Sequence, residues 1–155
     1  MIGPRAVAGE VYYLVVIIDH ATRFVVAGVT TDKRASTVAE LFRDCWYRYF
    51  GAPLAVLVDG GTEFKGEFFD LVQKCWKCRL YVTAPYRPQG NGVNESSHRG
   101  ISKALHGADV RSGPEVREAV SSAVLAHNNI PHPATGLAPV MALIGTDARY
   151  PNELP

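Results

Sequence analysis

The chain has 155 residues, of which 47 % are hydrophobic and 20 % charged, and this composition excludes a disordered segment and a fibrous protein. A chain of this length is expected to form one domain that buries roughly 70 % of the surface exposed by its unfolded form. Its 16 Lys and Arg residues nearly balance its 15 Asp and Glu residues, so net charge by itself does not favour a nucleic-acid partner.

The first predicted element is a β-hairpin made of two apolar runs, VYYLVVII from Val11 to Ile18 and FVVAGV from Phe24 to Val29. Because both runs are almost uninterrupted, we expect helices on both faces of the sheet that contains them. The longer run has eight residues, which is too few to cross a bilayer, and no secretory leader precedes it. The sequence therefore predicts an intracellular protein that is neither secreted nor bound in a membrane.

Helices and strands alternate in the middle of the chain. Apolar residues recur at helical spacing from Ala35 to Phe50 and again from about Thr62 to Trp76. Short β-rich runs follow them and predict a buried strand over residues 54–58 and another strand over residues 80–83. The inward positions are Val38, Leu41, Phe42, Cys45 and Tyr49 in the first helix and Phe64, Phe68, Leu71, Val72 and Cys75 in the second.

The last part of the chain is predicted to be mainly helical. A loop rich in Pro and Gly, residues 83–92, precedes a helix over residues 93–106. Ser112, Pro114 and Glu115 form the start signal of a further helix that ends near His127. Its inward positions are Val116, Val120, Ala123 and Val124, and a short apolar turn follows at residues 141–144. The whole order of elements indicates an α/β fold, with helices on the faces of a mixed sheet.

The three cysteines are an odd and small number, which favours reduced thiols over a disulfide framework. Cys75 and Cys78 form the motif CWKC, which also occurs in zinc and redox sites. A second pair of ligands is absent from the sequence, and the motif closes a predicted helix instead of opening one. Packing is therefore the favoured role of these cysteines, with a metal or redox role as the alternative.

Two acidic residues stand where a ligand site would be expected. Asp59 ends a buried strand and precedes two glycines, which places its side chain at the carboxyl edge of the sheet. Glu95 lies in the first turn of a helix that follows a glycine-rich loop. Each has a simpler interpretation, since Asp59 could be a turn residue and Glu95 a helix-start acid. Together they could bind Mg²⁺ through carboxylate oxygens and support phosphodiester chemistry.

The sequence around these acids resembles that of a known family. The stretches VDGGTEF and PYRPQGNGVNES, with 35 residues between Asp59 and Glu95, resemble the D,D-35-E motif in the catalytic core of retroviral and gypsy-type LTR retrotransposon integrases. The segments IDHATRF and HNNIPHPATGLAPVMALIG are similar to that family too. The resemblance implies a ribonuclease H-like fold with a mixed five-stranded sheet and helices on both faces. It also implies Mg²⁺ or Mn²⁺ as cofactor, 3′-end processing and strand transfer of element DNA to a target, a homodimer or higher oligomer, and a nuclear or intracellular location.

The chain departs from the family pattern at the first acid of the motif. That acid precedes a hydrophobic pair and Gly-Pro, and the corresponding position here is the one before Met1. Asp19 matches the family's acid at the end of the second strand, which introduces a turn. We therefore expect residues 1–155 to form a catalytic core truncated at the start of its first strand, without a zinc-binding or SH3-like domain. Such a core would be impaired in catalysis, and the alternative is a domesticated module that binds nucleic acid or dimerises without chemistry.

Several residues near Glu95 are candidates for contact with DNA. Basic groups beside a metal site would bind phosphates, and the resemblance implies that Tyr86, Asn91 and Arg99 touch DNA ends. The family often has Lys seven residues after the Glu, whereas this chain has Ser102 there and Lys103 next to it. The alternative for the charged residues is a solvated helix face. The complete candidate set is Tyr86, Arg87, Asn91, Arg99 and Lys103 for nucleic acid, with Asp59 and Glu95 for metal and catalysis.

Overall fold

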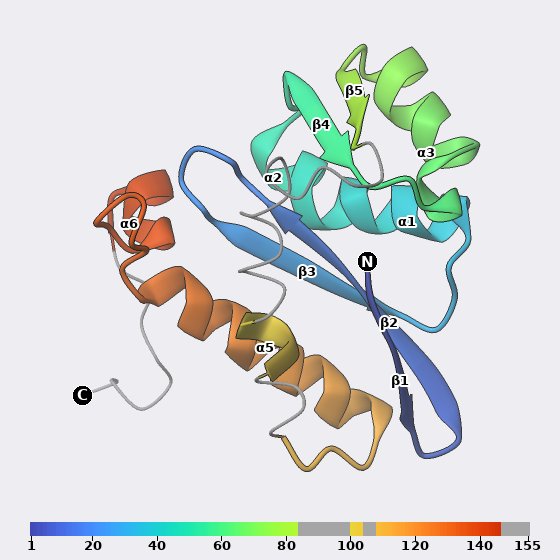
Figure 1. Cartoon of the computed structure of the whole chain (residues 1–155), viewed down its shortest axis with the longest axis vertical. Coiled ribbons are helices and arrows are strands. Elements are labelled where there is room, and N and C mark those ends of the chain that lie inside the picture. The colour runs from blue at the N-terminus through green and yellow to red at the C-terminus, as the bar shows by residue number, and fades with distance from the viewer. Residues whose placement is uncertain (84–99, 104–107, 147–155) are drawn as a thin grey trace.

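A computed structural model describes residues 1–83, 100–103 and 108–146 of the chain. Strands β1 (Ile2–Val7), β2 (Glu10–Ile18) and β3 (Val25–Thr30) form an antiparallel sheet in the order β1-β2-β3 (Figure 1). The predicted hairpin is confirmed as β2 and β3, which pair from Tyr13 opposite Thr30 to Ile18 opposite Val25.

Strands β4 (Ala55–Val58) and β5 (Arg79–Val82) form a second, parallel pair. All five strands expected from the family resemblance are present, but they hydrogen-bond as one sheet of three strands and one of two. The start of β1 and the end of β4 lie near each other, since the Asp59 carboxylate after β4 is 4.0 Å from the Met1 nitrogen.

Helices cover both faces of the antiparallel sheet, as predicted. Successive residues of a strand point to opposite faces, so Val15 of β2 packs on one side and Leu14 on the other. Val15 shares a buried cluster with Val38 of helix α1 (Ala35–Phe42), and Leu14 shares another with Val120 of helix α5 (Gly113–Asn129). Figure 1 shows α1 and α5 on opposite sides of the β2–β3 ribbon.

The predicted helix over residues 35–50 is continuous but not uniform. After α1 it widens into a π-helical segment, η1 (Arg43–Tyr47), and ends as α2 (Arg48–Phe50). A π-helical turn contains more residues than an α-helical turn, so positions after it rotate relative to the regular 3.6-residue pattern. The prediction that Tyr49 points inward was wrong for this reason, since Tyr49 is 70 % exposed.

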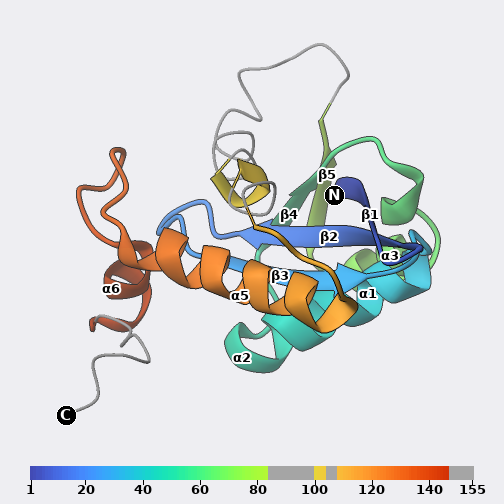
Figure 2. The same ribbon diagram turned by 90° about the horizontal axis from the view of Figure 1, so that it is seen from below.

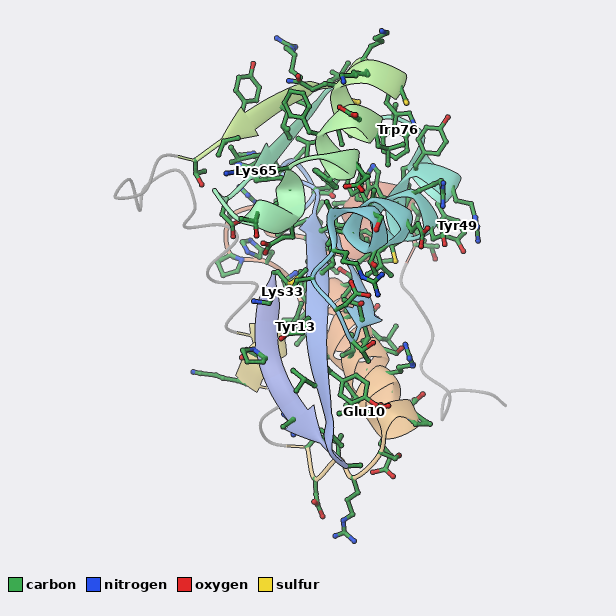
Figure 3. All side chains as sticks on the ribbon, turned by 90° about the vertical axis from the view of Figure 1, so that its right-hand side faces the viewer. Glu10, Tyr13, Lys33, Tyr49, Lys65 and Trp76 are labelled. Atoms are coloured by element: carbon green, nitrogen blue, oxygen red, sulfur yellow. The ribbon has the colours of Figure 1, made fainter. Side chains whose placement is uncertain are left out.

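Aromatic rings gather where this helix meets the next helical segment. Trp76 stacks on Tyr47 with ring centroids 4.3 Å apart and also contacts Phe42 at 5.5 Å. Trp46 packs against Phe50 at 4.7 Å. Figure 3 shows Tyr49 and Trp76 on the same side of the molecule, away from the Lys33 ammonium, which lies over the Tyr13 ring at 4.8 Å. These rings extend the α1 side of the core towards the surface.

The prediction of one helix over residues 62–76 was wrong, because the segment contains three short helices. They are the 3₁₀ helix η2 (Thr62–Phe64), α3 (Glu67–Phe69) and the π-helical η3 (Asp70–Cys75). Gly66 causes the break between the first two, since its φ of 55° is left-handed and incompatible with a right-handed helix. Phe68 and Val72 are buried as expected, whereas Cys75 is exposed.

The prediction that residues 54–58 form a buried strand holds for one face only. Val58 is buried in the α1 cluster and Val56 packs against it. On the other face, Leu57 and Tyr81 pair across the ladder and are 43 % and 51 % exposed, and Leu54, just before the strand, is 85 % exposed. A strand pair of this kind therefore has a solvated apolar face, where a fully covered parallel sheet would have none.

Helix α5 begins and packs as its sequence predicts. The Ser112 hydroxyl accepts a hydrogen bond from the Glu115 N–H, and Val116, Val120 and Ala123 are buried. Residues 100–103 are helical, and Ile101 joins the α5 side of the core. Helix α6 (Pro139–Ile144) lies at the carboxyl end of α5, at the opposite end of the molecule from α1 (Figure 2). No helix in the described ranges is long and apolar enough to cross a membrane.

Candidate functional site

The candidate site is centred on Asp59, which follows the last residue of β4. Thr83, the residue after β5, fixes this strand end, because its N–H and its hydroxyl both donate to the carbonyl oxygen of Val58, at 2.9 and 3.2 Å. Both parallel strands therefore end together and leave Asp59 at their carboxyl edge. This is the edge at which sheets of this class bind ligands, and the placement predicted for Asp59 is confirmed.

The Asp59 carboxylate is held on one side and open on the other. Its Oδ1 atom accepts a hydrogen bond from the Gly61 N–H at 3.1 Å, and its Oδ2 atom lies 4.0 Å from the Met1 nitrogen. The side chain is 51 % exposed, so solvent reaches the carboxylate. The bond to Gly61 is typical of an Asx turn, which orients the carboxylate without consuming its acceptor capacity.

Gly61 and Glu63 form a part of this site that the sequence analysis missed. A Cβ atom on Gly61 would lie 2.6 Å from Oε2 of Glu63, so the Glu63 carboxylate folds back over this glycine. Gly60 has nothing within 4 Å of the corresponding position. The sequence signal was the pair of glycines after Asp59, of which only the second has a side chain, that of Glu63, over it.

The remaining candidate residues fall mainly outside the described part of the chain. Glu95 and four of the residues assigned to nucleic acid lie there, namely Tyr86, Arg87, Asn91 and Arg99. Lys103 is described and exposed, two positions after the buried Ile101. The short helix of residues 100–103 thus fixes itself to the core through Ile101 and leaves the Lys103 side chain in solvent.

Asp19 is confirmed as a turn residue. Its Oδ2 atom accepts hydrogen bonds from both the N–H and the hydroxyl of Thr22, at 2.8 and 2.7 Å. Its own backbone closes the same turn through Phe24 and Arg23, at 2.8 and 2.9 Å. These bonds hold the β2–β3 connection and occupy the carboxylate.

The chemistry of Asp59 fits a hard divalent cation. Carboxylate oxygens are the ligands that Mg²⁺ prefers, and the Asp59 side chain, which is half exposed, can supply one. Within residues 1–83, 100–103 and 108–146, no three His, Cys, Asp or Glu side chains are grouped so that they could hold a metal. Asp59 therefore fits as one ligand of a site whose other ligands must come from elsewhere, and Glu95 is the candidate that the sequence offers.

The cysteines do not form a thiol site in the described structure. Cys78 is buried in the α1 cluster, and burial raises the pKa of its thiol. Burial, with the neighbouring Asp44 carboxylate, raises the pKa of Cys45 as well. Cys75 is exposed, so the favoured packing role is correct for Cys78 and wrong for Cys75. Raised pKa values suppress the thiolate that zinc binding and redox chemistry need.

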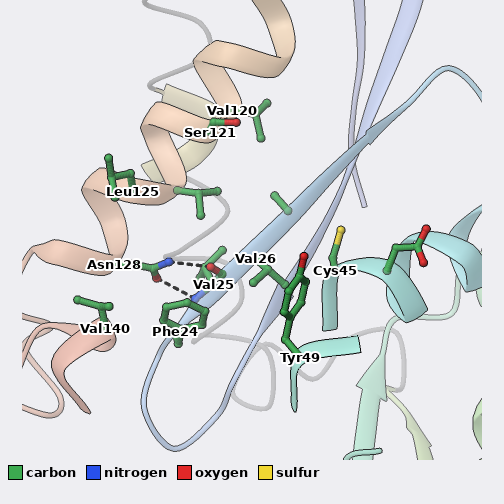
Figure 4. Close-up of a pocket in the computed structure, with 13 residues that line it drawn as sticks. Phe24, Val25, Val26, Cys45, Tyr49, Val120, Ser121, Leu125, Asn128 and Val140 are labelled. Atoms are coloured by element: carbon green, nitrogen blue, oxygen red, sulfur yellow. Dashed lines mark hydrogen bonds between the residues drawn. The ribbon is translucent and has the colours of Figure 1, made fainter. Parts of the chain in front are cut away.

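A hollow of about 480 Å³ lies elsewhere on the molecule, between β3 and helix α5. Phe24, Tyr49, Val124 and Val140 are among its mainly apolar lining residues, and Asp59 is not (Figure 4). At its base the Asn128 side chain bonds to both backbone groups of Val25, accepting from the N–H at 2.9 Å and donating to the carbonyl at 2.8 Å. Asn128 thereby occupies the free edge of β3 as a neighbouring strand would.

Comparison with known proteins agrees with this architecture. A family model described as an integrase core domain matches residues 2–88, more than half of the chain. The Pol polyprotein of feline endogenous virus ECE1 is 28 % identical over 134 residues, which cover 86 % of this chain and 13 % of that protein. The chain spans only 8 % to 13 % of the length of the curated relatives that it matches.

Solved structures of integrase cores have the same fold. The catalytic core domain of BIV integrase aligns with a TM-score of 0.69 at 22 % identity, covering 91 % of this chain and 90 % of that one. The catalytic core domain of HTLV-2 integrase, in complex with magnesium and in a trimeric form, aligns with a TM-score of 0.68 at 15 % identity and covers 86 % of each chain. Identities this low support the fold alone, which is the predicted ribonuclease H-like α/β fold. The family match over residues 2–88, together with this fold, shows that the chain belongs to the integrase core domain family.

Proposed function

We propose that this chain is the catalytic core of a retroelement integrase, which processes the 3′ ends of element DNA and joins them to a target. The observation that carries the proposal is the position of Asp59, which follows β4 and lies near the start of β1. A residue placed before Met1 would be covalently attached to the nitrogen that lies 4.0 Å from the Asp59 carboxylate. An acid at that position, where the family pattern has one, would thus stand beside Asp59.

Asp59 and Glu95 are the proposed metal ligands, with Mg²⁺ or Mn²⁺ as the ion. A divalent ion of this kind activates a water or hydroxyl nucleophile and neutralises charge on the phosphate during transfer. The chain's own contribution is to hold the Asp59 carboxylate in place through the Gly61 N–H while leaving the side chain about half exposed to solvent. Lys103, with Tyr86, Arg87, Asn91 and Arg99, is proposed to bind the DNA.

The proposed partners are element-end and target DNA and further copies of the same chain, in a nuclear or intracellular setting. An oligomer is supported by the mainly apolar hollow between β3 and α5 and by the exposed Tyr49 at its margin. Apolar surface of this kind is common where subunits meet.

A DNA-joining assay tests the proposal. Because the cognate element is undefined, the donor is a pool of duplex oligonucleotides with randomised ends and the acceptor is a supercoiled plasmid, incubated with Mn²⁺. The chain is compared with a version that carries one additional Asp before Met1, and each is also made as Glu95→Gln. We expect joining by the extended chain, loss of joining in its Glu95→Gln form, and at most weak joining by the chain without the extension.

The other outcomes are equally informative. An inactive extended chain that still binds DNA would support the alternative of a non-catalytic nucleic-acid-binding module. An extended chain that neither joins nor binds DNA, although circular dichroism shows it folded, would contradict both functions.

A further inference from the structure

The turn between β2 and β3 contains a partly buried arginine, Arg23, that the proposed function does not use. The Nε and Nη1 atoms of Arg23 are buried and have no hydrogen-bond partner. Arg23 also has a φ of 68°, a left-handed conformation that few residues other than Gly, Asn and Asp adopt. Buried polar groups normally have partners, so an unpartnered guanidinium in a constrained backbone calls for an explanation.

One histidine at the end of α5, His127, contacts Arg23, and a second, His132, follows in the next loop. The Nε2 atom of His127 is 3.1 Å from the Arg23 carbonyl oxygen. Since a carbonyl oxygen only accepts, His127 must donate this bond, which holds the Arg23 backbone in its unusual conformation. The distance in sequence is 104 residues, so the tertiary fold alone creates this contact.

His132 carries a ring N–H donor on its Nε2 atom. Its Nδ1 atom accepts a hydrogen bond from the Ala134 N–H at 3.1 Å, so the proton of the neutral ring resides on Nε2. Further backbone bonds fix the residue, because its N–H donates to the Leu137 carbonyl at 3.0 Å and its carbonyl accepts from Gly136 at 2.8 Å. Partial burial lowers the pKa of His132, and the nearby charges of Arg23 and His127 lower it further.

The cluster has positive charge and donors but no anion of its own. Within the described residues, no carboxylate forms an ion pair with Arg23. The nearest acid in the turn is Asp19, whose Oδ2 atom already serves Thr22. Guanidinium nitrogens without acceptors, together with an imidazole N–H, form a donor set of the kind that binds oxyanions in proteins.

We propose that Arg23 and His132, supported by His127, form a binding site for a phosphate group. The ligand oxygens would accept from the guanidinium and from the His132 Nε2–H, and the phosphate charge would offset the unpaired charge of Arg23. The phosphate can belong to a DNA backbone or to a free phosphate ion, and the chemistry of recognition is the same. The site lies in the β2–β3 turn, away from the carboxyl edge where Asp59 stands.

The test is an NMR titration of the full chain with inorganic phosphate, with NaCl adjusted to keep ionic strength constant. Arg23→Asn removes the guanidinium but keeps a residue that tolerates a left-handed backbone. His132→Ala removes the second donor without changing residue 23. Arg34→Gln is the matched control, because Arg34 is an exposed arginine paired with Asp32 in a loop. We expect saturable shifts of the Arg23 and His132 signals in the natural chain and in Arg34→Gln. In the other two variants the affinity for phosphate should fall by about tenfold or more.

A second arm distinguishes the sources of the phosphate. Binding of a duplex oligonucleotide is measured as a function of salt for the same proteins. The slope of log affinity against log salt concentration reports the number of phosphate contacts. If this slope decreases in Arg23→Asn by the amount of about one contact, DNA is the ligand. An unchanged salt dependence, with phosphate binding lost, identifies the free ion.

The proposal is overturned if phosphate shifts in the natural chain do not saturate, or if folded Arg23→Asn and His132→Ala bind phosphate as the natural chain does. A purely structural Arg23 would change the melting temperature of the variant without changing its response to phosphate.

Discussion

Asp19 and Asp59 each follow an apolar strand and each begin a turn, yet their carboxylates have different surroundings. Oδ2 of Asp19 accepts two hydrogen bonds from Thr22, one from the backbone and one from the hydroxyl. Asp59 accepts one bond, from the Gly61 N–H, and its side chain is 51 % exposed. The difference arises from the residues that follow each acid, because Thr22 supplies a side-chain donor whereas Gly60 and Gly61 have no side chains to cover the carboxylate.

This comparison teaches that a strand-end aspartate is suited to ligand binding only when its turn leaves oxygens available. A carboxylate that accepts bonds within its own turn stabilises the fold, and its transfer to a metal would break those bonds. A carboxylate held by a single backbone N–H keeps its orientation and most of its acceptor capacity. Substitutions at the two acids should therefore have opposite consequences for function and for stability.

The largest expected effect is on DNA joining. In the chain extended by an Asp before Met1, Asp59→Asn should reduce Mn²⁺-dependent joining by about 10²-fold or more, because an amide cannot supply the negative charge that binds the ion. Asp19→Asn should leave the rate within about threefold of the parent, because the Asp19 carboxylate holds a turn and is not a proposed metal ligand. The rates are measured on the plasmid acceptor, and equal losses in the two variants would contradict the assignment.

The second expected effect is on stability, with the order of the two acids reversed. Asp19→Ala should lower the free energy of unfolding by about 1–2 kcal/mol, because it removes both hydrogen bonds to Thr22 from the β2–β3 turn. Asp59→Ala should change it by no more than about 0.5 kcal/mol, as expected for an exposed side chain. Urea unfolding followed by circular dichroism measures both, and a larger loss for Asp59→Ala would reverse the comparison.

A third, smaller effect concerns the two glycines that leave Asp59 uncovered. Gly61→Ala should cost no more than about 0.5 kcal/mol, because the atom 2.6 Å from its Cβ is Oε2 of Glu63, the end of a flexible side chain that can swing away. Gly60→Ala is the matched control and should be within about 0.5 kcal/mol of neutral as well, since nothing lies within 4 Å of its Cβ. Urea unfolding measures both, and a clearly larger loss in Gly61→Ala would mean that the Glu63 carboxylate is held over Gly61.

The smallest effect is a pH dependence confined to the Asp19 end of the molecule. His132 has a pKa below its ordinary value of 6.5, owing to burial and to the charges of Arg23 and His127. Its neutral form is thus favoured by folding, so its contribution to stability is complete above pH 6.5 and is lost as the pH falls below that value towards the lowered pKa. Between about pH 7.5 and 5 in phosphate-free buffer, the melting temperature of His132→Asn should decrease less than that of the natural chain. Equal losses would mean that the folded environment does not favour the neutral ring.

Elements with strong local signals were predicted well from the sequence. The hairpin of β2 and β3 follows from two apolar runs with a polar turn, and α5 follows from Ser112 and Glu115 with Val116 and Val120 at helical spacing. The places where prediction failed are those where the backbone departs from regular geometry. Gly66 interrupts the second helix, and the π-helical turn of η1 moves Tyr49 to the surface. Apolar spacing assumes a regular helix, so it cannot register either change.

The candidate site was predicted in part. The strand-end position of Asp59 followed from the apolar run before it and the glycines after it, and the family resemblance indicated its role. The Glu63 carboxylate over Gly61 was missed, because the sequence does not reveal which way an exposed side chain folds. Glu95 and its neighbours stay predictions, since they lie outside the described part of the chain.

The sequence by itself determined the β2–β3 hairpin, the strands β4 and β5, the capped helix α5, the turn chemistry of Asp19 and the motif that indicates an integrase core. These features depend on residues a few positions apart, whose hydrogen bonds and apolar spacing are local. Only the tertiary structure decided that Asp59 meets the start of β1 and that Arg23 meets His127 across 104 residues. Such contacts follow from the packing of α1 and α5 on opposite faces of one sheet, because burial of Val15 on one side and Leu14 on the other fixes where distant turns come together.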